Sequence, residues 1–393
     1  MKFKINTPGS KSYTNRALFI TSMCASKVKI KNALISDDTK AMTRCLKILK
    51  TKRAKYNLNA RLSGTTIRFI LALACLMPGE KIIYGEESLN KRPVKDLVES
   101  LRQLGAKIEY QNRAGYPPLK ITSSILYPGT IKMKGDISSQ YISALLMIAP
   151  LVGQVSIKVT GDQVSKPYID MTIDTMEKFG VKVINNHYHQ YFIPDNQSYF
   201  AKEYSVEGDF SSAGYFFAIA ALTKSTITLK NLNPLSKQAD VKFLKILEDM
   251  GNKIIRGKNQ ITIYGRGVKP VVVDMQDCPD QVQTLSVLAG FAQGKTLIKG
   301  IKSLRIKETD RVKALQNELK KMGVKTIITQ NTMTIFGGNP HGAIIETYND
   351  HRMAMAFAVA ACKISGVVIK NPEVVSKTFP TFWDELRKIN KTI

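Results

Sequence analysis

Residues 94–108 read VKDLVESLRQLGAKI, an amphipathic segment that ends in Leu-Gly and runs on into Lys-Ile. Apolar residues recur every three or four positions before the glycine, which predicts a helix with one buried face. Gly105 then supplies the left-handed backbone conformation that commonly ends a helix, and the residues after it are typical of the start of a strand. The segment therefore predicts a helix that is closed by glycine and followed by a short strand.

The same pattern recurs along the chain. Similar segments lie at 171–183, 241–254 and 312–326. Their closing glycines, with that of the first segment, are Gly105, Gly180, Gly251 and Gly323, which are 75, 71 and 72 residues apart. Weaker relatives lie at 41–50, without the glycine, and at 382–389. Self-similarity at a nearly fixed period indicates a repeated structural unit.

A second kind of segment begins with small or polar residues and continues as an almost wholly apolar helix. The clearest pair reads GDISSQ at 135–140 and GDFSSA at 208–213. The other starts lie at 12–18, 64–69, 279–285 and 350–355. A helix that is apolar on all sides must be buried, and a β-rich stretch follows each one. We therefore predict an α/β (α+β) chain in which strand, helix, strand, helix and further strands are repeated six times, three times in each of two similar lobes.

Length and composition agree with two globular lobes. The chain has 393 residues, more than one hydrophobic core usually serves, with 44% hydrophobic and 23% charged residues. Its net charge of +27 suits anionic partners, but a lysine-rich surplus is equally typical of a solvated surface. Charge alone therefore leaves nucleic acid, anionic lipid and small anionic substrates open.

Cysteine and histidine usage excludes several classes of protein. The five cysteines form no C-x-x-C pair, and an odd number makes a disulfide framework a poor interpretation. The four histidines show no metal-ligand spacing, and His187 and His189 fall in a polar stretch that we interpret as a hairpin or loop. No apolar run reaches the length of a membrane span, and the first residues lack the apolar core of a signal peptide. We expect a soluble, cytoplasmic protein without a metal.

The polar starts of the apolar helices have two interpretations. Ser138, Ser211 and Asp280 could each be a helix N-cap. Alternatively, helix N-termini that carry free N–H groups and the positive end of the dipole could together bind anions. Because six such starts occur and several carry a cation, the second interpretation gains weight.

Cationic residues accompany many of these starts. Lys11 and Arg16 flank the first one, Arg92 precedes Pro93 at the predicted mouth of a helix, and Lys377 precedes a second proline. The run 305–311 reads RIKETDR, and a helix there would place Lys307 and Arg311 on one face, although a solvated charge run is an equal alternative. A substrate pair with several phosphates or carboxylates would suit so many cations. The candidates for acid–base chemistry are then Asp280, Glu308, Asp350 and His351.

Taken in order, these segments resemble one family, the 5-enolpyruvylshikimate-3-phosphate (EPSP) synthases, from about residue 7 to 382. The matching segments are PGSKS at 8–12, NR at 15–16, SGT at 63–65, Arg68, RP at 92–93, SSQ at 138–140, SKPYID at 165–170, VEGD at 206–209, PD at 279–280, KETDR at 307–311, NDHRMAM at 349–355 and KTFP at 377–380. Each is weak alone, whereas the ordered set is specific.

The resemblance implies a fold and a domain division. Members of the family have two lobes of three βαβαββ-type repeats, an arrangement like an inverse α/β barrel, which agrees with the six repeats above. The first strand is expected in the C-terminal lobe, so that residues 1–10 and 209–393 form one lobe and residues 11–208 the other. The active site is expected in the cleft between the lobes.

The resemblance also implies the reaction. The 5-hydroxyl of shikimate 3-phosphate attacks C2 of phosphoenolpyruvate, and a tetrahedral intermediate then expels phosphate, a step in chorismate and aromatic amino acid biosynthesis. No metal or organic cofactor is implied. The partners are the two small substrates, with no nucleic acid or membrane, and the protein is expected to be a monomer.

The family match assigns residues to each role. The residues implied for catalysis are Lys11, Asp280, Lys307 and Glu308. Those implied for shikimate 3-phosphate are Lys11, Ser12, Arg16, Ser138, Ser139, Gln140, Ser165, Asp280 and Lys307. Those implied for phosphoenolpyruvate are Lys11, Gly64, Arg92, Gln140, Arg311, Arg352 and Lys377. Asp280 would accept the proton of the hydroxyl, and Glu308 would protonate the methylene carbon. His351 would orient other groups or hydrogen-bond to them, and would not act as the main base.

Two departures from the family pattern bear on binding. Leu62 stands where the family commonly has Asn, which removes one phosphate contact, and Phe69 stands where one class has Pro. Gly64 leaves room for a compact inhibitor that resembles phosphoenolpyruvate, so we expect the protein to be a glyphosate target.

Two other functions remain as alternatives. The related enolpyruvyl transferase that acts on UDP-N-acetylglucosamine relies on a loop cysteine, and residues 84–91 contain none. A nucleic-acid-binding protein would need basic residues interleaved with stacking aromatic residues, but the lysines here are spread over the repeats.

Overall fold

The computed structural model describes residues 2–51, 53–122, 125–136 and 138–389. The chain divides into two compact units, which we call the N-terminal unit (Lys11–Val206) and the C-terminal unit (Met1–Ser10 with Glu207–Ile393). Glu207 and Gly208, which the sequence analysis put in the N-terminal lobe, lie with the C-terminal unit. There the Ser10 N–H donates to the Glu207 carbonyl at 2.8 Å, and Gly9 forms an antiparallel bridge with Gly208.

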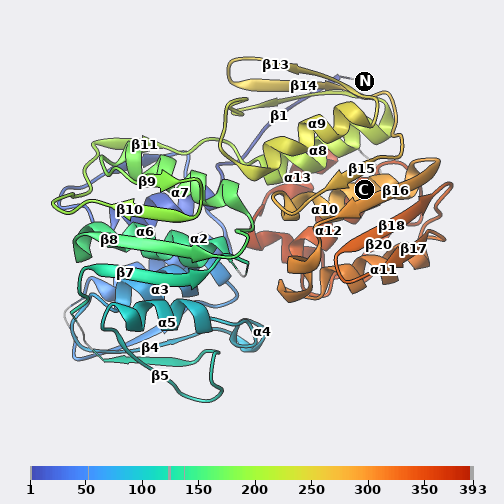
Figure 1. Ribbon diagram of the computed structural model, residues 1–393. Coiled ribbons are helices and arrows are strands. Elements are labelled where there is room, and N and C mark those ends of the chain that lie inside the picture. Colours follow the sequence, from blue (N-terminus) through green and yellow to red (C-terminus); the bar gives the residue numbers. More distant parts are fainter. Residues whose placement is uncertain (1, 52, 123–124, 137, 390–393) are drawn as a thin grey trace. The chain divides into compact units, whose positions relative to one another are not determined.

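Both kinds of predicted helix are present in each unit (Figure 1). The N-terminal unit contains α1 (Lys11–Thr21), α2 (Asp37–Leu49), α3 (Gly64–Ala74), α4 (Glu87–Asn90), α5 (Lys95–Gln103), α6 (Ser139–Val152) and α7 (Lys166–Lys178). The C-terminal unit contains α8 (Phe210–Thr223), α9 (Lys242–Asp249), α10 (Val282–Phe291), α11 (Arg311–Lys321), α12 (His351–Ala361) and α13 (Phe382–Arg387). It also has the short 3₁₀ helices η1 (Ala239–Val241), η2 (Pro279–Gln281), η3 (Lys302–Ile306) and η4 (Pro372–Lys377).

The glycines that were predicted to close the amphipathic helices do so. Gly105, Gly180, Gly251 and Gly323 have φ angles of 94°, 83°, 106° and 80°. Side chains with a Cβ rarely adopt this left-handed conformation, so glycine is the residue that lets each helix end and a new segment begin.

Four sheets share one strand order. In each, the first two strands are parallel, the third is antiparallel to the second, and the fourth is antiparallel to the third. In the N-terminal unit they are β3 (Lys55–Asn59), β4 (Glu80–Tyr84), β6 (Leu119–Thr122) and β5 (Lys107–Tyr110), then β7 (Gly129–Lys134), β8 (Val155–Thr160), β10 (Gln190–Ile193) and β9 (Ile184–Asn186). In the C-terminal unit they are β1 (Lys2–Asn6), β12 (Thr226–Lys230), β14 (Gln260–Tyr264) and β13 (Lys253–Arg256), then β15 (Val272–Asp274), β16 (Gly294–Lys299), β18 (Thr332–Gly337) and β17 (Lys325–Ile328).

Four of the six predicted repeats have the final pair of strands, and in the other two no such pair lies within the described residues. Their sheets are parallel pairs, β2 (Lys29–Lys31) with β11 (Glu203–Ser205) and β19 (Ile344–Ile345) with β20 (Val368–Ile369). In the first of them α2 ends at Leu49 and β3 begins at Lys55, so the link is too short for another hairpin. In the second, no strand follows α13 within the described residues.

Two strands pair with a strand that is distant in the sequence. β1 aligns with β12 in the C-terminal unit, with Lys2 opposite Thr226, and β11 aligns with β2 in the N-terminal unit, with Glu203 opposite Lys29. Both pairs are parallel. The chain therefore passes between the units twice, at 10–11 and at 206–207.

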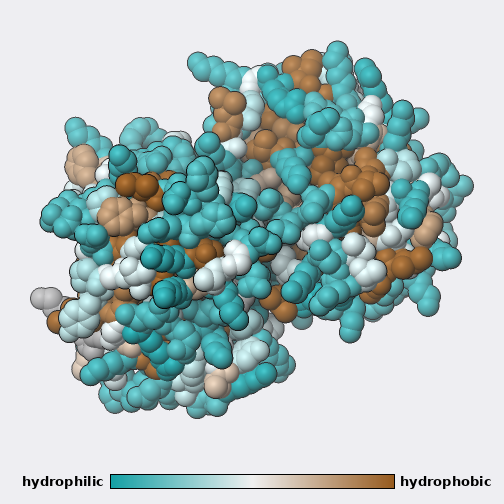
Figure 2. Space-filling view, viewed as in Figure 1, coloured by the Kyte–Doolittle hydropathy of each residue, from teal (hydrophilic) through white to brown (hydrophobic). Residues whose placement is uncertain are grey.

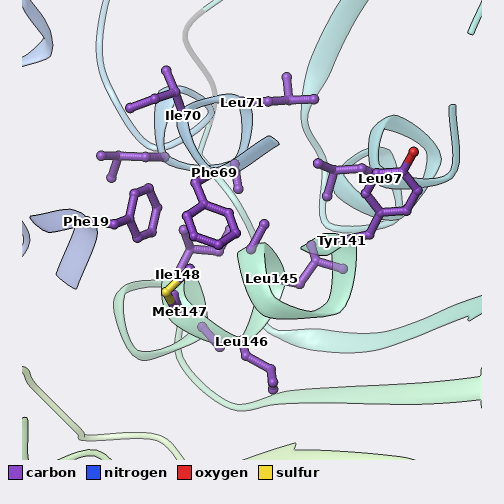
Figure 3. Packing of buried hydrophobic residues seen from close by; sticks show 14 of the residues in the cluster. Phe19, Phe69, Ile70, Leu71, Leu97, Tyr141, Leu145, Leu146, Met147 and Ile148 are labelled. Carbon is purple, nitrogen blue, oxygen red and sulfur yellow. The ribbon is translucent and has the colours of Figure 1, made fainter. Parts of the chain in front are cut away.

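The apolar helices form the cores, as predicted. In the N-terminal unit Phe19 of α1, Phe69 of α3 and Met147 of α6 point toward one another (Figure 3), and the rings of Phe19 and Phe69 are 5.5 Å apart. In the C-terminal unit, α8, α10 and α12 are buried along nearly their whole length. Because these helices must be buried, only their ends can present polar groups to a ligand.

The histidine-containing stretch forms the predicted hairpin. β9 and β10 are antiparallel neighbours, and His187 and Tyr188 in the turn have φ angles of 49° and 64°.

Two helices start later than predicted. Pro93 and Pro380 both precede the N-cap residue of their helix instead of lying in its first turn.

Part of the charge on the surface lies in ion pairs. Hydrophilic residues cover much of the face of each unit drawn in Figure 2. Several exposed lysines pair with an acid one helical turn away, such as Lys91 with Glu87 and Lys245 with Asp249. Such exposed pairs contribute little to stability. No helix within the described residues is long and apolar enough to cross a membrane.

Candidate active site

The C-terminal unit gathers carboxylates around a buried arginine. Arg311, the first residue of α11, is 1% exposed, and its guanidinium contacts three acids. Nε donates to Asp350 at 2.7 Å, Nη2 to Glu308 at 2.9 Å and Nη1 to Asp280 at 3.3 Å. Burial opposes the charge of Arg311, but the three carboxylates outweigh it and raise its pKa above the ordinary value. Arg311 therefore fixes three acids from three separate segments.

A second arginine holds Asp280 from another side. Arg352, at the start of α12, donates from Nη2 to Asp280 Oδ2 at 2.7 Å and from Nη1 to the Asp280 carbonyl at 3.3 Å. Its Nη1 also lies 3.4 Å from the hydroxyl of Tyr215 on α8. Burial raises the pKa of Tyr215 to about 12, so this hydroxyl stays protonated. Asp280 is thus held by two arginines.

Glu308 lies between two cations. Its Oε1 accepts from Lys377 Nζ at 2.9 Å, and its Oε2 accepts from Arg311. The predicted helical face for Lys307 and Arg311 is wrong: Asp310 caps α11 by accepting from the N–H groups of Val312 and Lys313, so Lys307 precedes the helix. Because the helix begins only after Asp310, Glu308 lies in a bend before it, and its carboxylate reaches Arg311.

The start of α12 orders Asp350 and His351. Asp350 is the N-cap and accepts from the Arg352 N–H at 2.9 Å, while its carboxylate also accepts from Arg311. His351 is buried beside it, with Nδ1 3.6 Å from an Asp350 oxygen. Asp350 therefore connects the two arginines.

The N-terminal unit holds its buried Arg16 with neutral groups. Arg16 of α1 donates to Thr172 Oγ1 at 2.8 Å, to the Tyr168 carbonyl at 2.7 Å and to the Ser12 carbonyl at 3.0 Å. Burial lowers the pKa of Arg16 to about 10. Arg16 thus ties α1 to α7 through its own hydrogen bonds.

Lys11 and Ser165 lie at two helix starts of this unit. Lys11 begins α1 and pairs with Asp38 at 3.6 Å. Ser165 is the N-cap of α7 with a left-handed φ of 56°, and its hydroxyl does not cap the helix. A non-glycine residue in that conformation costs free energy, which marks the position as a candidate for a functional role.

Gly64 and Arg92 lie against each other. A Cβ at Gly64, the first residue of α3, would come within 2.6 Å of Arg92 Nη1, so only glycine leaves the guanidinium where it is. On the next turn of α3, Arg68 donates to the Oε1 of Gln140, whose Nε2 donates to Thr65 Oγ1 at 3.2 Å. Gln140 is thereby held in one orientation.

The N-cap interpretation fits one of the three residues proposed for it. Ser138 caps α6 by accepting from the Gln140 N–H at 3.3 Å, and Ser139 follows as the first, buried residue of that helix. Asp209, and not Ser211, caps α8. Asp280 caps no α-helix and instead pairs with Arg311 and Arg352.

The assigned residues of the C-terminal unit form one connected set. In the C-terminal unit, ion pairs join Asp280, Glu308, Arg311, Arg352 and Lys377. Lys307 adjoins this set by sequence, and Ser12 adjoins Lys11.

Sequence reasoning missed two residues of this region, Tyr215 and Asp240. Tyr215 lies in an apolar helix, where a tyrosine is typical of the core, and Asp240 lies in η1 with no motif around it. The only sequence signal was a polar group in an otherwise apolar setting. Among the described residues no group of histidine, cysteine and acidic side chains could hold a metal ion.

Comparison with known proteins identifies the family. The family model described as EPSP synthase (3-phosphoshikimate 1-carboxyvinyltransferase) matches residues 1–386. The chain belongs to the EPSP synthase family. This assignment confirms the resemblance found in the sequence.

Relatives of similar length support the assignment to the EPSP synthase family. A 3-phosphoshikimate 1-carboxyvinyltransferase from Sulfurovum sp. is 39% identical over 411 residues, which cover 98% of this chain and 96% of the relative. One from Shewanella woodyi is 40% identical over 405 residues, covering 97% and 95%. A solved EPSP synthase structure from Acinetobacter baumannii is 24% identical, with a TM-score of 0.83 over 99% of this chain and 95% of that one. The two-lobed α/β fold predicted for the family is therefore confirmed.

Proposed function

We propose that the residues described above carry out the reaction of the EPSP synthase family in this chain, with Asp280 and Glu308 as the acid–base groups. The enolpyruvyl group of phosphoenolpyruvate is transferred to the 5-hydroxyl of shikimate 3-phosphate, and phosphate is released. The observation that carries the proposal is the arrangement of Asp280 and Glu308, two carboxylates that share Arg311 and each contact a further cation.

Asp280 is suited to accept the proton of the attacking hydroxyl. Its carboxylate is held in one orientation by Arg311 and Arg352, and these charges keep it available as an anion. As the O–C2 bond forms, the hydroxyl proton passes to Asp280, and it then passes to the departing phosphate or to water, which restores the carboxylate. A positioned base of this kind typically contributes about 10²–10⁴-fold to the rate.

Glu308 is suited to serve the neighbouring carbon. C3 of phosphoenolpyruvate gains a proton as C2 is attacked, and it loses one again when the C2–O bond to phosphate breaks. Lys377 and Arg311 hold the two oxygens of Glu308, and Lys307 is adjacent in sequence. Glu308 can therefore enter the cycle protonated, donate its proton to C3 and take a proton back from C3, so the group is unchanged after one turnover.

The remaining assigned residues bind the anions. Arginines hold carboxylates and phosphates through two hydrogen bonds at once, which suits Arg92, Arg311 and Arg352 to phosphoenolpyruvate. The residues that complete its set are Lys11, Gly64, Gln140 and Lys377. Those proposed for shikimate 3-phosphate are Lys11, Ser12, Arg16, Ser138, Ser139, Gln140, Ser165, Asp280 and Lys307. That the two sets meet in one cleft stays a prediction, as do the monomeric state and the cytoplasmic location.

A phosphate-release assay tests the proposal. With phosphoenolpyruvate present, the purified chain should release phosphate when shikimate 3-phosphate is added and not when UDP-N-acetylglucosamine is added. Release with the nucleotide sugar alone would contradict the substrate assignment.

A further inference from the structure

Asp240 is a buried carboxyl with two neutral donors. It lies in η1, is 4% exposed, and accepts from the hydroxyl of Ser211 on one oxygen and from the thiol of Cys278 at 3.2 Å on the other. Burial and the nearby carboxyl keep the pKa of Cys278 above its ordinary value, so the sulfur remains a thiol that can donate. Asp240 is therefore satisfied by hydrogen bonds without a paired cation.

The thiol that binds Asp240 precedes the proposed proton acceptor by two residues. Cys278 is the N-cap residue of η2, the short helix that contains Asp280. Gln281, which follows Asp280, donates from its side-chain amide Nε2 to the Phe210 and Ser211 carbonyls at 3.3 and 3.2 Å. A Cβ at Gly214 would come within 2.3 Å of the Gln281 amide oxygen, so η2 packs directly on α8. Asp240 and α8 together hold the turn that carries Asp280.

Asp240 is near another carboxyl group, Asp280, and forms no ion pair within the described residues. The charged groups that influence it are Asp280 of η2 and Arg352 of α12, while Lys242 lies near the Cys278 thiol. Within the described residues no lysine or arginine forms an ion pair with Asp240, whereas the equally buried Asp350 pairs with Arg311. Burial and the negative charge of Asp280 raise the pKa of Asp240 to about 6. Asp240 therefore takes up its proton at a higher pH than an ordinary aspartate does.

We propose that Asp240 is a positioning residue for Asp280. Asp240 anchors the η2 turn through Cys278, and its negative charge strengthens Asp280 as a proton acceptor. The proposal rests on the assignment of Asp280 under the proposed function. A negative neighbour favours the protonated form of a carboxyl, so Asp280 binds the substrate proton more strongly while Asp240 is ionised. Once Asp240 is protonated, Asp280 becomes the weaker base.

This coupling predicts a specific pH dependence. As the pH falls through about 6, Asp240 takes up a proton and kcat should fall by about threefold to tenfold, because a change of one pKa unit in a base alters the rate by at most about tenfold. Because Asp240 and Asp280 interact, the step in kcat reports the titration of both carboxyls together and not of one alone. Ionisation of the substrate phosphates near the same pH affects wild type and variants alike, so the difference between profiles isolates Asp240.

The first experiment compares kcat from pH 5 to pH 8.5 for wild type and Asp240→Asn. The variant keeps the shape of the side chain and removes the charge. We expect its kcat to equal that of wild type at pH 5 and to be about threefold to tenfold lower at pH 8. A loss by the same factor at every pH would mean that Asp240 only supports the fold, and would overturn the proposal.

A second variant keeps the carboxyl and moves its titration. Ser211 stabilises the ionised form of Asp240, so Ser211→Ala should raise the pKa of Asp240 and shift the step in kcat to higher pH. This test stands even if Asp240→Asn does not fold. A step that stays at the wild-type pH in Ser211→Ala would also overturn the proposal.

Failure of this inference can be told apart from failure of the proposed function. If Asp280→Asn is inactive while the profiles of wild type and Asp240→Asn run parallel, only the role of Asp240 falls. If Asp280→Asn keeps full activity, the assignment of the proton acceptor falls, and the role of Asp240 with it.

Discussion

The two units hold their arginines in opposite ways. In the C-terminal unit, Arg311 and Arg352 bind carboxylates, so the positive charge is already balanced before any substrate arrives. In the N-terminal unit, Arg16 is held by hydroxyl and carbonyl groups, which position the guanidinium without neutralising its charge. The difference indicates a partial division of labour. The C-terminal unit supplies the acid–base groups, and the N-terminal unit adds charge to an anion binding that it shares with Arg311, Arg352 and Lys377.

The largest expected effect comes from the acid–base side. Asp280→Asn removes the proposed proton acceptor while keeping its shape, so turnover should fall by about 10²–10⁴-fold. Calorimetric titration should show that shikimate 3-phosphate still binds. Asp249→Asn, an exposed acid paired with Lys245 on α9, is the matched control and should keep wild-type turnover. Full activity of Asp280→Asn would contradict the division.

Removing one arginine from each unit tests the contrast through stability. Arg311→Met leaves three carboxylates facing one another, which should cost about 3–5 kcal/mol of unfolding free energy, as breaking buried ion pairs does. Arg16→Met leaves only neutral acceptors, and about 1–3 kcal/mol is expected. Denaturant unfolding of the ligand-free chain measures both. Equal losses would show that the carboxylates do not distinguish the two sites.

A methyl group at Gly64 tests how the anion-binding side is positioned. The new Cβ would lie 2.6 Å from Arg92 Nη1, so the guanidinium must move. We expect Gly64→Ala to raise the KM for phosphoenolpyruvate and the inhibition constant of glyphosate by about tenfold, which corresponds to about 1.4 kcal/mol. Gly129→Ala is the control, since a Cβ there meets no atom within 4 Å. Wild-type turnover under saturating glyphosate would refute the expectation that glyphosate binds the wild-type chain.

The smallest effect should come from a residue that departs from the family pattern. Leu62 is 38% exposed and directly precedes Ser63, the N-cap of α3. Leu62→Asn restores an amide that can donate to a phosphate, and one hydrogen bond of about 0.5–1 kcal/mol should lower the KM for phosphoenolpyruvate by about twofold to fivefold. Leu62→Ala, which shortens the side chain without adding a donor, should not lower it. Equal KM values for the two variants would contradict a phosphate contact at this position.

The repeats could be read from the sequence because they rest on local rules. A glycine that ends a helix and an apolar helix that must be buried both leave periodic marks, and Gly105 and its three counterparts have the expected backbone. The loss of the last two strands in two repeats left no such mark, because it depends on the length of a link.

The site could be predicted only in part for a related reason. Asp280 and Arg311 stood out in charged motifs, but their contact joins η2 to the start of α11 and depends on tertiary packing. Local spacing even misled, since the i, i+4 relation of Lys307 and Arg311 suggested a helix that Asp310 prevents. Asp240 had no motif at all, and only its burial beside Cys278 and Ser211 reveals it.

The pairing of β1 with β12 has a consequence for biosynthesis. Lys2 must wait for Thr226, 224 residues later, before its strand has a partner. At about 5–20 residues per second, translation leaves β1 unpaired for roughly 10–45 s. The sheet that contains β1 is thus completed late, when residues 11–206 have already left the ribosome, so the N-terminal unit has the opportunity to fold first on the growing chain.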